Sequence, residues 1–541
     1  MAGPVSPLAK SVVEKYDKLK ATRSVWERIW GDLKDLVRPD TSSFSSTATR
    51  SGMSNTDRLF DGTAPWSLEQ LASGLHSYLT SPTDRWFGLT LKGVDPNSLT
   101  DSIRLWLELN SDIIYQEYAR PTVNFNPMVH EMYLDIGAFG TSVMFEGYSF
   151  KTNSLMFRSI PLADAWVEEN DEGIIDTLFR RIKWNLRQIE QQFGEIPPET
   201  RKDAEKQQGK EFEVIHAVFP RANRDTGKLT QTNMKFASIW VIKELKYVIR
   251  ESGFMEFPYP TPRWTKVSGE TYGRSPGMVC LPDIRMLNAM SKTLIKAAEK
   301  AVDPPLLVPD DGFMLPIKTA PASLIYHETG LQDELKPLIS GGDPGLSLEL
   351  MEQRREQIRR TFFTDWLIRQ RKKERQTTVE IMDERNEMLQ QLAPMLGRLQ
   401  TEFMGPTIRR SIRLLDRAGR LVPPPPELEG AKIDIIYTSP AAKAQMSGKA
   451  TVMQAYVQDI ASLAQIDPTA LDGIDFDAMA KELGKLRDVS QTIMRSDEQI
   501  MQLREQRQMK EQQQELLTGG VEAAKATKDF AMAEKALGGS R

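Results

Sequence analysis

The chain has 541 residues, a formal net charge of −4 and a single cysteine. This length exceeds what one hydrophobic core usually serves, so two or more packed regions are expected. The mildly acidic balance excludes a generally basic nucleic-acid binder, and any DNA contact must come from a local basic patch. A single cysteine excludes an intrachain disulfide and fits a reducing compartment.

The first quarter of the chain is predicted to be helical. Apolar residues recur at helical spacing over 6–38 and 57–79, and again over 100–137 with a break near Pro121. Pro39 ends the first of these helices. The first residues lack the apolar core of a signal peptide. No apolar run approaches the roughly 20 residues that span a bilayer, so neither secretion nor a membrane is predicted.

The pattern changes near residue 139 into an α+β region that reaches residue 260. A turn leads into a strand over 139–146, and a polar helical insertion occupies 185–211. Runs rich in β-branched and aromatic residues predict further strands near 155–160, 164–168, 173–184, 212–220, 235–242 and 245–251. The proline-rich run 257–262 must be extended, because proline restricts its own backbone and that of the preceding residue.

The second half of the chain is mainly helical. Helices are predicted at 282–303, 346–369 and 377–419, with kinks in the last one at Pro394 and Pro406. Between the first two, 304–345 is rich in Pro and Gly and predicts loops with two short strands. A proline spacer, a short strand and a largely helical C-terminal part follow, at 423–426, 433–437 and 440–517.

Each candidate motif for catalysis or metal binding lacks a residue or a spacing that its chemistry requires. The sequence 273–277 matches the G-x-S-x-G nucleophile elbow, but Pro276 follows Ser275 and has no N–H to offer an oxyanion. No phosphate-binding loop is present. The four histidines and Cys280 do not form a metal-ligand spacing. We therefore predict no enzyme, no cofactor and no metal.

A basic cluster stands out against the acidic whole. Between residues 351 and 375, nine basic side chains outnumber four acidic ones. Its basic members are Arg354, Arg355, Arg359, Arg360, Arg369, Arg371, Lys372, Lys373 and Arg375. One interpretation is a solvated helix face held by salt bridges. The other is a surface that faces phosphates, which gains weight if the chain forms a ring that multiplies each charge.

Several motifs together resemble the portal proteins, or head-to-tail connectors, of short-tailed bacteriophages. The resemblance spans about residues 20–450. It rests on WERIW at 26–30, RLFDGTA at 58–64, LASGL at 71–75, LTSP at 79–82, RWF at 85–87, FGT at 139–141, TYGRSPG at 271–277, DPP at 303–305, LGRL at 396–399, RAGRL at 417–421 and YTSPA at 437–441. Gly62 and Ala441 replace the commoner Ser and Leu of the family pattern.

The resemblance implies a mainly helical α+β portal fold that assembles as a cyclic ring. Each part of that fold then has a place in the sequence. The implied parts are N-terminal helices and a wing at 1–281, a first stem helix at 282–303, a clip at 304–345, a second stem helix at 346–368, a tunnel loop at 369–377, a kinked long helix returning to the wing at 378–439, and a helical crown with a tail at 440–541.

The function that the resemblance implies is a DNA conduit in the virion. A dodecameric ring at one capsid vertex passes double-stranded DNA during packaging and ejection, and docks the terminase large subunit and then a tail adaptor protein. Major capsid and scaffolding proteins are further partners, and assembly takes place in the host bacterial cytoplasm.

Specific side chains are expected to serve this conduit. Arg369, Arg371, Lys372, Lys373 and Arg375 would form a cationic ring at the tunnel loop, and Arg354, Arg355, Arg359 and Arg360 a basic face of the stem. Phe313, Leu315 and Ile317 would take part in clip docking. Trp86, Trp166 and Trp264 are either core residues or contacts between neighbouring wings.

Two other classes remain as alternatives. A non-enzymatic coiled-coil scaffold or nucleic-acid-binding assembly protein would explain the Gln-rich C-terminal helix and the basic cluster. The second alternative is an enzyme, such as a hydrolase acting through Ser275 or a nuclease. Loss of activity on a Ser275→Ala change would favour the enzyme, whereas the portal has no activity to lose. The scaffold predicts an elongated oligomer without a channel, whereas the portal predicts a ring.

Overall fold

In the computed structural model the chain divides into two compact units. Unit 1 comprises Met1–Thr83 and Tyr115–Arg420, and unit 2 comprises Asp84–Ile114 and Leu421–Arg541. The structure describes residues 6–41, 44, 56–94, 99–194, 201, 210–225, 227–228, 230–302, 306–307, 336–337, 344–364, 392–428, 433–438, 440–464, 475–486 and 500–510.

The centre of unit 1 is a five-stranded antiparallel sheet in the order β4-β5-β6-β7-β8. Each strand pairs with its neighbour in sequence, which is the usual arrangement in an antiparallel sheet. The strands are β4 (Ala165–Glu169), β5 (Ile175–Asn185), β6 (Glu211–Pro220), β7 (Phe236–Ile242) and β8 (Tyr247–Phe254). All five strands predicted between 164 and 251 are therefore present, with shifts of a few residues.

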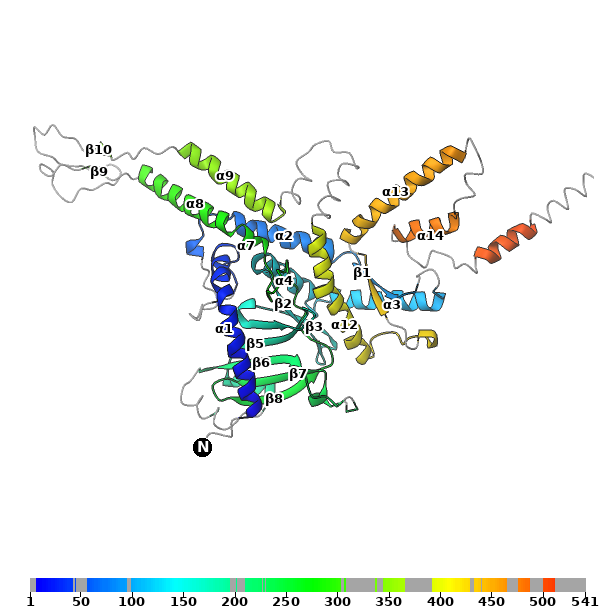
Figure 1. The fold of residues 1–541 in the computed structure, drawn as a ribbon, viewed down its shortest axis with the longest axis horizontal. Coiled ribbons are helices and arrows are strands. Elements are labelled where there is room, and N and C mark those ends of the chain that lie inside the picture. The colour runs from blue at the N-terminus through cyan, green and yellow to red at the C-terminus, as the bar shows by residue number, and fades with distance from the viewer. Residues whose placement is uncertain are drawn as a thin grey trace, which may run out of the picture. The chain divides into compact units, whose positions relative to one another are not determined.

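Helix α1 (Pro7–Leu36) covers one face of this sheet (Figure 1). Its apolar stripe packs with inward-facing residues of β4 to β7 in one core cluster made up of Ala9, Val12, Val13, Tyr16, Trp166, Phe179, Ile215, Ala217, Ala237, Ile239 and Val241. The buried Arg23 of α1 donates to the backbone oxygens of Leu162, Ala163 and Ala165, and its guanidinium lies 4.0 Å from the ring centroid of Trp166. Periodicity predicts the apolar stripe but not this buried cation.

The opposite face of the sheet carries a smaller core with α5 (Leu186–Phe193). Asn185 caps this helix in a capping box with Gln188, which explains why it starts directly after β5. It lies within the predicted polar insertion.

A two-stranded hairpin of β2 (Val143–Ser149) and β3 (Ser154–Ile160) is extended by the proline-rich run 257–262. The N–H groups of Ser142, Met144 and Glu146 donate to the carbonyls of Pro262, Pro260 and Pro258. Prolines at every second position leave only acceptors on this edge, so the run pairs with β2 although it has few donors. The predicted extended conformation is confirmed.

Three more helices precede these strands in the sequence, and the first begins later than predicted. Helix α2 (Thr63–Leu79) starts at residue 63 rather than 57, because Asp61 and Gly62 form its entrance and Asp61 Oδ1 accepts from the backbone N–H of Thr63. The predicted break near Pro121 separates α3 (Asp101–Ala119) from α4 (Phe125–Phe139).

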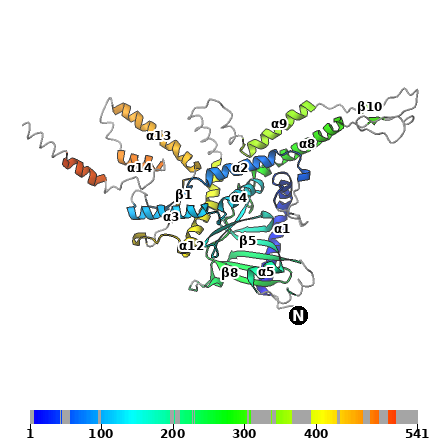
Figure 2. The same ribbon diagram turned by 180° about the vertical axis from the view of Figure 1, so that it is seen from behind.

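The helices α8 (Leu281–Val302) and α9 (Pro344–Thr361) lie side by side and extend away from the sheet (Figures 1 and 2). The short strands β9 (Leu306–Leu307) and β10 (Lys336–Pro337) pair between them along the chain. Helix α9 ends eight residues before the predicted end at 369. Phe363 takes a left-handed backbone, with φ of 58°, which a helix cannot continue through.

The predicted kink near Pro406 is present as a π-helical turn over Gln400–Met404 that leads into α12 (Gly405–Arg417). Residues 392–399 before it are helical. Pro406 has no N–H for the carbonyl of Glu402, so an ordinary helical turn cannot close there and the ladder widens.

Unit 2 contains β1 (Phe87–Leu91) and β11 (Ile433–Tyr437), which form an antiparallel pair. Strand β11 was predicted and is half-buried, whereas β1 was not predicted. Trp106 donates to the carbonyl of Val422, and the N–H of Val422 donates to Asn110. The helices α13 (Pro440–Ala464) and α14 (Phe476–Leu486) follow. Among the residues described, no helix is long and apolar enough to cross a membrane.

A buried polar network joins β2 to α12 inside unit 1. Tyr118 donates to Ser411 Oγ at 2.8 Å, and Ser411 donates to Glu146 Oε1 at 2.7 Å. Burial raises the pKa of Glu146 to about 8, and the charge of Arg410 and the hydrogen bond from Ser411 offset this only in part. The Glu146 carboxyl is therefore protonated at neutral pH.

This raised pKa predicts a stability that falls as pH rises. The unfolded chain releases the Glu146 proton near pH 4.3, whereas the folded chain holds it to about pH 8, so the free energy of unfolding decreases through that window. Burial also raises the pKa of Asp135 to about 6 and lowers the pKa values of His76 and His216, which titrate near pH 6.5 in the unfolded chain, so the slope between pH 7 and 8 is the diagnostic one. Glu146→Gln should flatten it in denaturant melts, and an unchanged slope would refute the assignment.

Candidate functional site

The described part of the basic cluster lies on α9, and each of its four arginines has a carboxylate partner. Arg354 donates to Asp283 of α8 at 2.9 Å, which ties the two helices together. Arg355 donates through Nε and Nη2 to Asp61, at 3.1 and 2.9 Å. Arg359 pairs with Glu352 at 2.9 Å and Arg360 with Glu356 at 3.7 Å.

Asp61 is the most tightly held of these carboxylates. Burial alone would raise its pKa, but hydrogen bonds from Thr63 and Arg355 outweigh it and hold the pKa below the usual range. Asp61 belongs to the RLFDGTA motif at 58–64, so that motif brings the entrance of α2 to α9. Four guanidinium groups thus face four carboxylates, and this surface has a weaker positive field than the sequence alone indicates.

The other predicted site residues fall outside the part of the chain that the structure describes. These are Arg369, Arg371, Lys372, Lys373 and Arg375 of the basic cluster, and Phe313, Leu315 and Ile317 of the Pro/Gly-rich segment. Their roles remain predictions.

The FGT and TYGRSPG motifs, which are far apart in the sequence, form a single close backbone contact. The N–H of Gly273 donates to Thr141 Oγ1 at 2.8 Å, and the N–H of Trp264 donates to the carbonyl of Gly140 at 2.9 Å. A Cβ on Gly140 would lie 2.3 Å from the carbonyl oxygen of Gly273, and the converse holds for Gly273. Glycine at both positions is what allows the two chains to approach.

Ser275 has a structural role at this contact. Its buried hydroxyl donates to the carbonyl of Ala138 at 2.7 Å and accepts from the N–H of Met278 at 2.9 Å. It thereby caps the short helix α7 (Pro276–Val279), with Pro276 as the first helical residue. This geometry is a tight turn before a helix, and the hydroxyl is 1% exposed and bonded to two backbone groups, which does not suit a nucleophile.

Two other side chains that can be reactive, those of Cys280 and His216, are also buried. Burial raises the pKa of the Cys280 thiol to about 12, so it stays protonated. Burial lowers the pKa of His216 to about 3; its ring contacts Ser238 and Tyr259 by hydrogen bonds and stacks on Trp240. Within the described residues, no group of three or more potential ligands could hold a metal ion.

A buried ion cluster at Arg263 had no sequence signal. The Arg263 side chain, 1 % exposed, bonds to Glu402 of the π-helical turn and pairs with Glu169 of β4. The neighbouring Trp264 packs against Phe363, with ring centroids 6.2 Å apart. Residues 263–264 therefore contact the chain on both sides of 365–391, the segment that includes the basic residues 369–375.

The tryptophans proposed as exposed contacts are core residues instead. Trp86, Trp166 and Trp264 are all buried, so the core interpretation is correct and the interface interpretation is wrong. Each packs beside a strand or loop of its own unit, where a large flat ring fills the interior.

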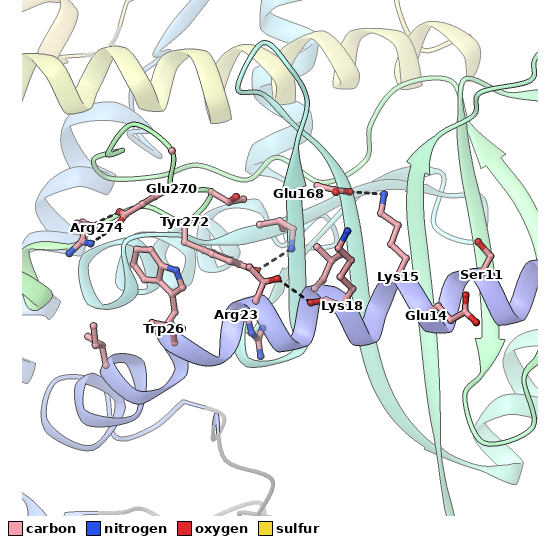
Figure 3. A pocket seen from close by; sticks show the side chains of 17 residues that line it. Ser11, Glu14, Lys15, Lys18, Arg23, Trp26, Glu168, Glu270, Tyr272 and Arg274 are labelled. Carbon is pink, nitrogen blue, oxygen red and sulfur yellow. Dashed lines mark hydrogen bonds and ion pairs between the residues drawn. The ribbon is translucent and has the colours of Figure 1, made fainter.

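A surface groove of about 700 Å³ lies between α1 and residues 269–274 (Figure 3). Ion pairs Lys15–Glu168 and Arg274–Glu270, at 2.6 Å each, stand along its walls. Trp26 and Tyr272 lie towards one end, with their ring centroids 5.9 Å apart. Figure 3 shows Ser11 and Glu14 at the other end. This groove was not predicted, because the α1 residues that line it and residues 269–274 are at least 240 residues apart in sequence.

These features define a mixed helix-and-strand protein with a protruding helix pair and a surface groove. The chain belongs to the family of bacteriophage head to tail connecting proteins, whose model matches residues 9–494. A portal protein of Salmonella phage epsilon15 is 29% identical over 532 residues, covering 96% of this chain and 94% of that protein. A probable portal protein of Bordetella phage BPP-1 is 26% identical over 530 residues, covering 95% and 94%.

Solved structures give a more distant match. A chain from the neck of an empty GTA particle is similar over 76% of this chain and 90% of its own length, with 11% identity and a TM-score of 0.39. The resemblance to phage portal proteins that the motifs indicated is confirmed by the family match, which extends beyond residues 20–450 at both ends.

Proposed function

We propose that this chain is the portal subunit of a short-tailed phage, forming a ring at one capsid vertex through which double-stranded DNA enters and leaves. The observation that carries the proposal is membership of the head-to-tail connecting family across nine-tenths of the chain. The ring is dodecameric, and it docks the terminase large subunit during packaging and a tail adaptor protein afterwards. Major capsid and scaffolding proteins surround it in the virion. It acts as a conduit and not as an enzyme.

The parts of the portal then fall on the elements of the chain. The helices α8 and α9 form the stem, and the segment between them, with Phe313, Leu315 and Ile317, forms the clip that docks partners. The sheet of unit 1 with α1 belongs to the wing. The tunnel loop is 369–377, and the C-terminal helices from residue 440 form the crown. The protruding antiparallel pair of α8 and α9 supports the stem assignment.

We assign the guidance of DNA mainly to the tunnel loop, and only in second place to the basic face of the stem. The carboxylate partners of Arg354, Arg355 and Arg359 leave those arginines less available to phosphates. Arg360 is the most exposed of the four, with 60% of its side chain accessible, and is the stem residue best placed to reach DNA. A conduit should not grip its cargo, so one cationic band in an otherwise acidic ring suits sliding.

The triple change Arg371→Ala/Lys372→Ala/Lys373→Ala is expected to reduce DNA-filled heads by about tenfold while rings still form, because each subunit loses three phosphate contacts. Packaged DNA per head is the measurement, by nuclease protection. A matched control, Lys10→Ala/Lys20→Ala/Lys228→Ala, removes the same charge from the surface of unit 1. Normal packaging by the tunnel-loop variant would contradict the assignment.

The oligomer is tested directly by electron microscopy with native mass spectrometry of the purified chain. Rings of about twelve subunits with an open axial channel are expected, consistent with closed cyclic symmetry. Monomers, or rods without a channel, in the presence of scaffolding and capsid proteins would reject the portal assignment.

A further inference from the structure

One exposed stripe of α1 lines the groove, and its residues change from polar to apolar along the helix. Its residues recur every three or four positions, which places them on one helical face. They are Ser11, Lys15, Lys18, Thr22, Val25 and Ile29. The stripe is polar towards the N-terminus and apolar towards Val25, which is 76% exposed. Trp26 beside it forms an aromatic wall with Tyr272.

An apolar knob stands elsewhere on the same unit. Phe150, at the tip of the β2–β3 hairpin, is 90% exposed, more than any other large hydrophobic residue among those described. Its chain neighbours are held firmly. Tyr148 donates to Asn153 Oδ1 at 2.6 Å, and the backbone oxygen of Asn153 accepts from Arg420 at 2.6 Å. The tip is therefore ordered before any partner binds, which reduces the entropy lost on binding.

The knob and the groove lie on opposite sides of unit 1. Arg420, which holds the hairpin tip, directly follows α12, and the groove is built on α1. In Figures 1 and 2 strand β5 lies between α1 and α12. A single chain thus carries a protruding apolar group and, elsewhere on the same unit, a groove with one apolar end.

We propose that the groove receives the Phe150 hairpin tip of a second copy of this chain, as the repeating contact around the ring. The inference rests on the proposed portal function, because a ring needs a heterologous contact in which two different surfaces of each subunit meet. A recess and a projection on opposite sides satisfy this requirement, whereas two like surfaces would close a dimer. Phe150 would lie against Val25, Trp26 and Ile29.

The sizes of the two parts are compatible. A Phe side chain buries about 150–250 Å², and a groove of about 700 Å³ has room for the phenyl ring with its turn residues. A stable interface buries about 800 Å² on each partner, so this contact is a central anchor and further surfaces of both subunits must also meet. Anchors of this kind dominate the effect of single substitutions.

Two substitutions test the contact from its two sides. Phe150→Glu and Val25→Glu place a charge in the knob and in the recess, and each should abolish rings in native mass spectrometry, with at least a tenfold loss of ring signal. Tyr247→Glu is the matched control, since Tyr247 is a 40% exposed aromatic residue at the β7–β8 turn. It should assemble as the unchanged chain does. Circular dichroism and melting temperature report whether each variant is folded.

Mixing the two variants separates a lost contact from a lost fold. The Phe150→Glu chain keeps an intact groove and the Val25→Glu chain keeps an intact tip, so an equal mixture should give one-to-one dimers that neither gives alone. In a further chain carrying both Val25→Cys and Phe150→Cys, a short bis-maleimide should produce a ladder of oligomers, which either single cysteine change should not. The native Cys280 is buried and should not react.

The outcomes distinguish this contact from the function on which it rests. If the unchanged chain forms no ring with its capsid partners present, the portal assignment fails. If the unchanged chain forms rings and both glutamate variants also do, without a cross-linked ladder, the knob-and-groove contact is wrong and the portal assignment stands.

Discussion

Replacing Gly140 by alanine is expected to destabilise unit 1 by more than about 4 kcal/mol, the range reached only by severe steric or burial defects. The new Cβ would meet the carbonyl oxygen of Gly273 at 2.3 Å and the carbonyl carbon of Arg274 at 2.7 Å. Both are backbone atoms, so no side-chain rotation can relieve the overlap. Gly140 also has a φ of 80°, which adds strain for any residue with a side chain.

The matched control for this change is Gly419→Ala. Gly419 also has a positive φ, of 66°, but a Cβ there would meet nothing within 4 Å. Its replacement should cost only the left-handed backbone strain, about 1–2 kcal/mol. The difference between the two variants in chemical denaturation therefore measures the steric overlap alone. Equal losses would mean that the two glycine motifs do not depend on their close approach.

The elements of the fold were predictable wherever their periodicity was local. The strands from β4 to β8 and the helices α1 and α8 all have continuous patterns, and the alternating prolines at 258, 260 and 262 dictate an extended chain. Strand β1 was missed because five residues between two polar turns give too short a signal. The end of α9 was misplaced because helical spacing continues beyond Phe363, whose left-handed backbone has no signal in the local sequence.

The candidate site was less predictable, since it depends on which distant residues meet. Arg354 and Arg355 belong to the predicted basic cluster, but their carboxylate partners could not be predicted. Asp283 lies 71 residues from Arg354 in sequence, and Asp61 lies 294 residues from Arg355. The groove likewise joins α1 to residues 269–274. Spacing reveals such pairs only within one element. The family motifs were informative for another reason: RLFDGTA, FGT and TYGRSPG supply Asp61, Gly140 and Gly273, which hold long-range contacts.

The second large effect is expected at Arg263. Arg263→Met should destabilise unit 1 by about 3–5 kcal/mol, because it keeps the side-chain volume but leaves carboxylates in the interior without their cation. Burial alone would lower the pKa of Arg263, but hydrogen bonds and charge from Glu402 and Glu169 raise it, so the guanidinium is charged in the fold. The free energy of unfolding from denaturant titration is the measurement. Arg274→Met, which breaks an exposed pair with Glu270, should change it by no more than about 1 kcal/mol.

A double-mutant cycle measures the coupling free energy between Arg263 and Glu402. Glu402 accepts three hydrogen bonds from Arg263, through Nε, Nη2 and the backbone N–H, at 3.1, 2.7 and 2.9 Å. Glu402→Gln removes the charge but keeps the shape, and combined with Arg263→Met it should cost less than the sum of the single changes by about 1–3 kcal/mol. Additive losses would show that the π-helical turn is held by its packing. A coupling of the expected size would mean that this ion cluster joins the π-helical turn to the sheet of unit 1.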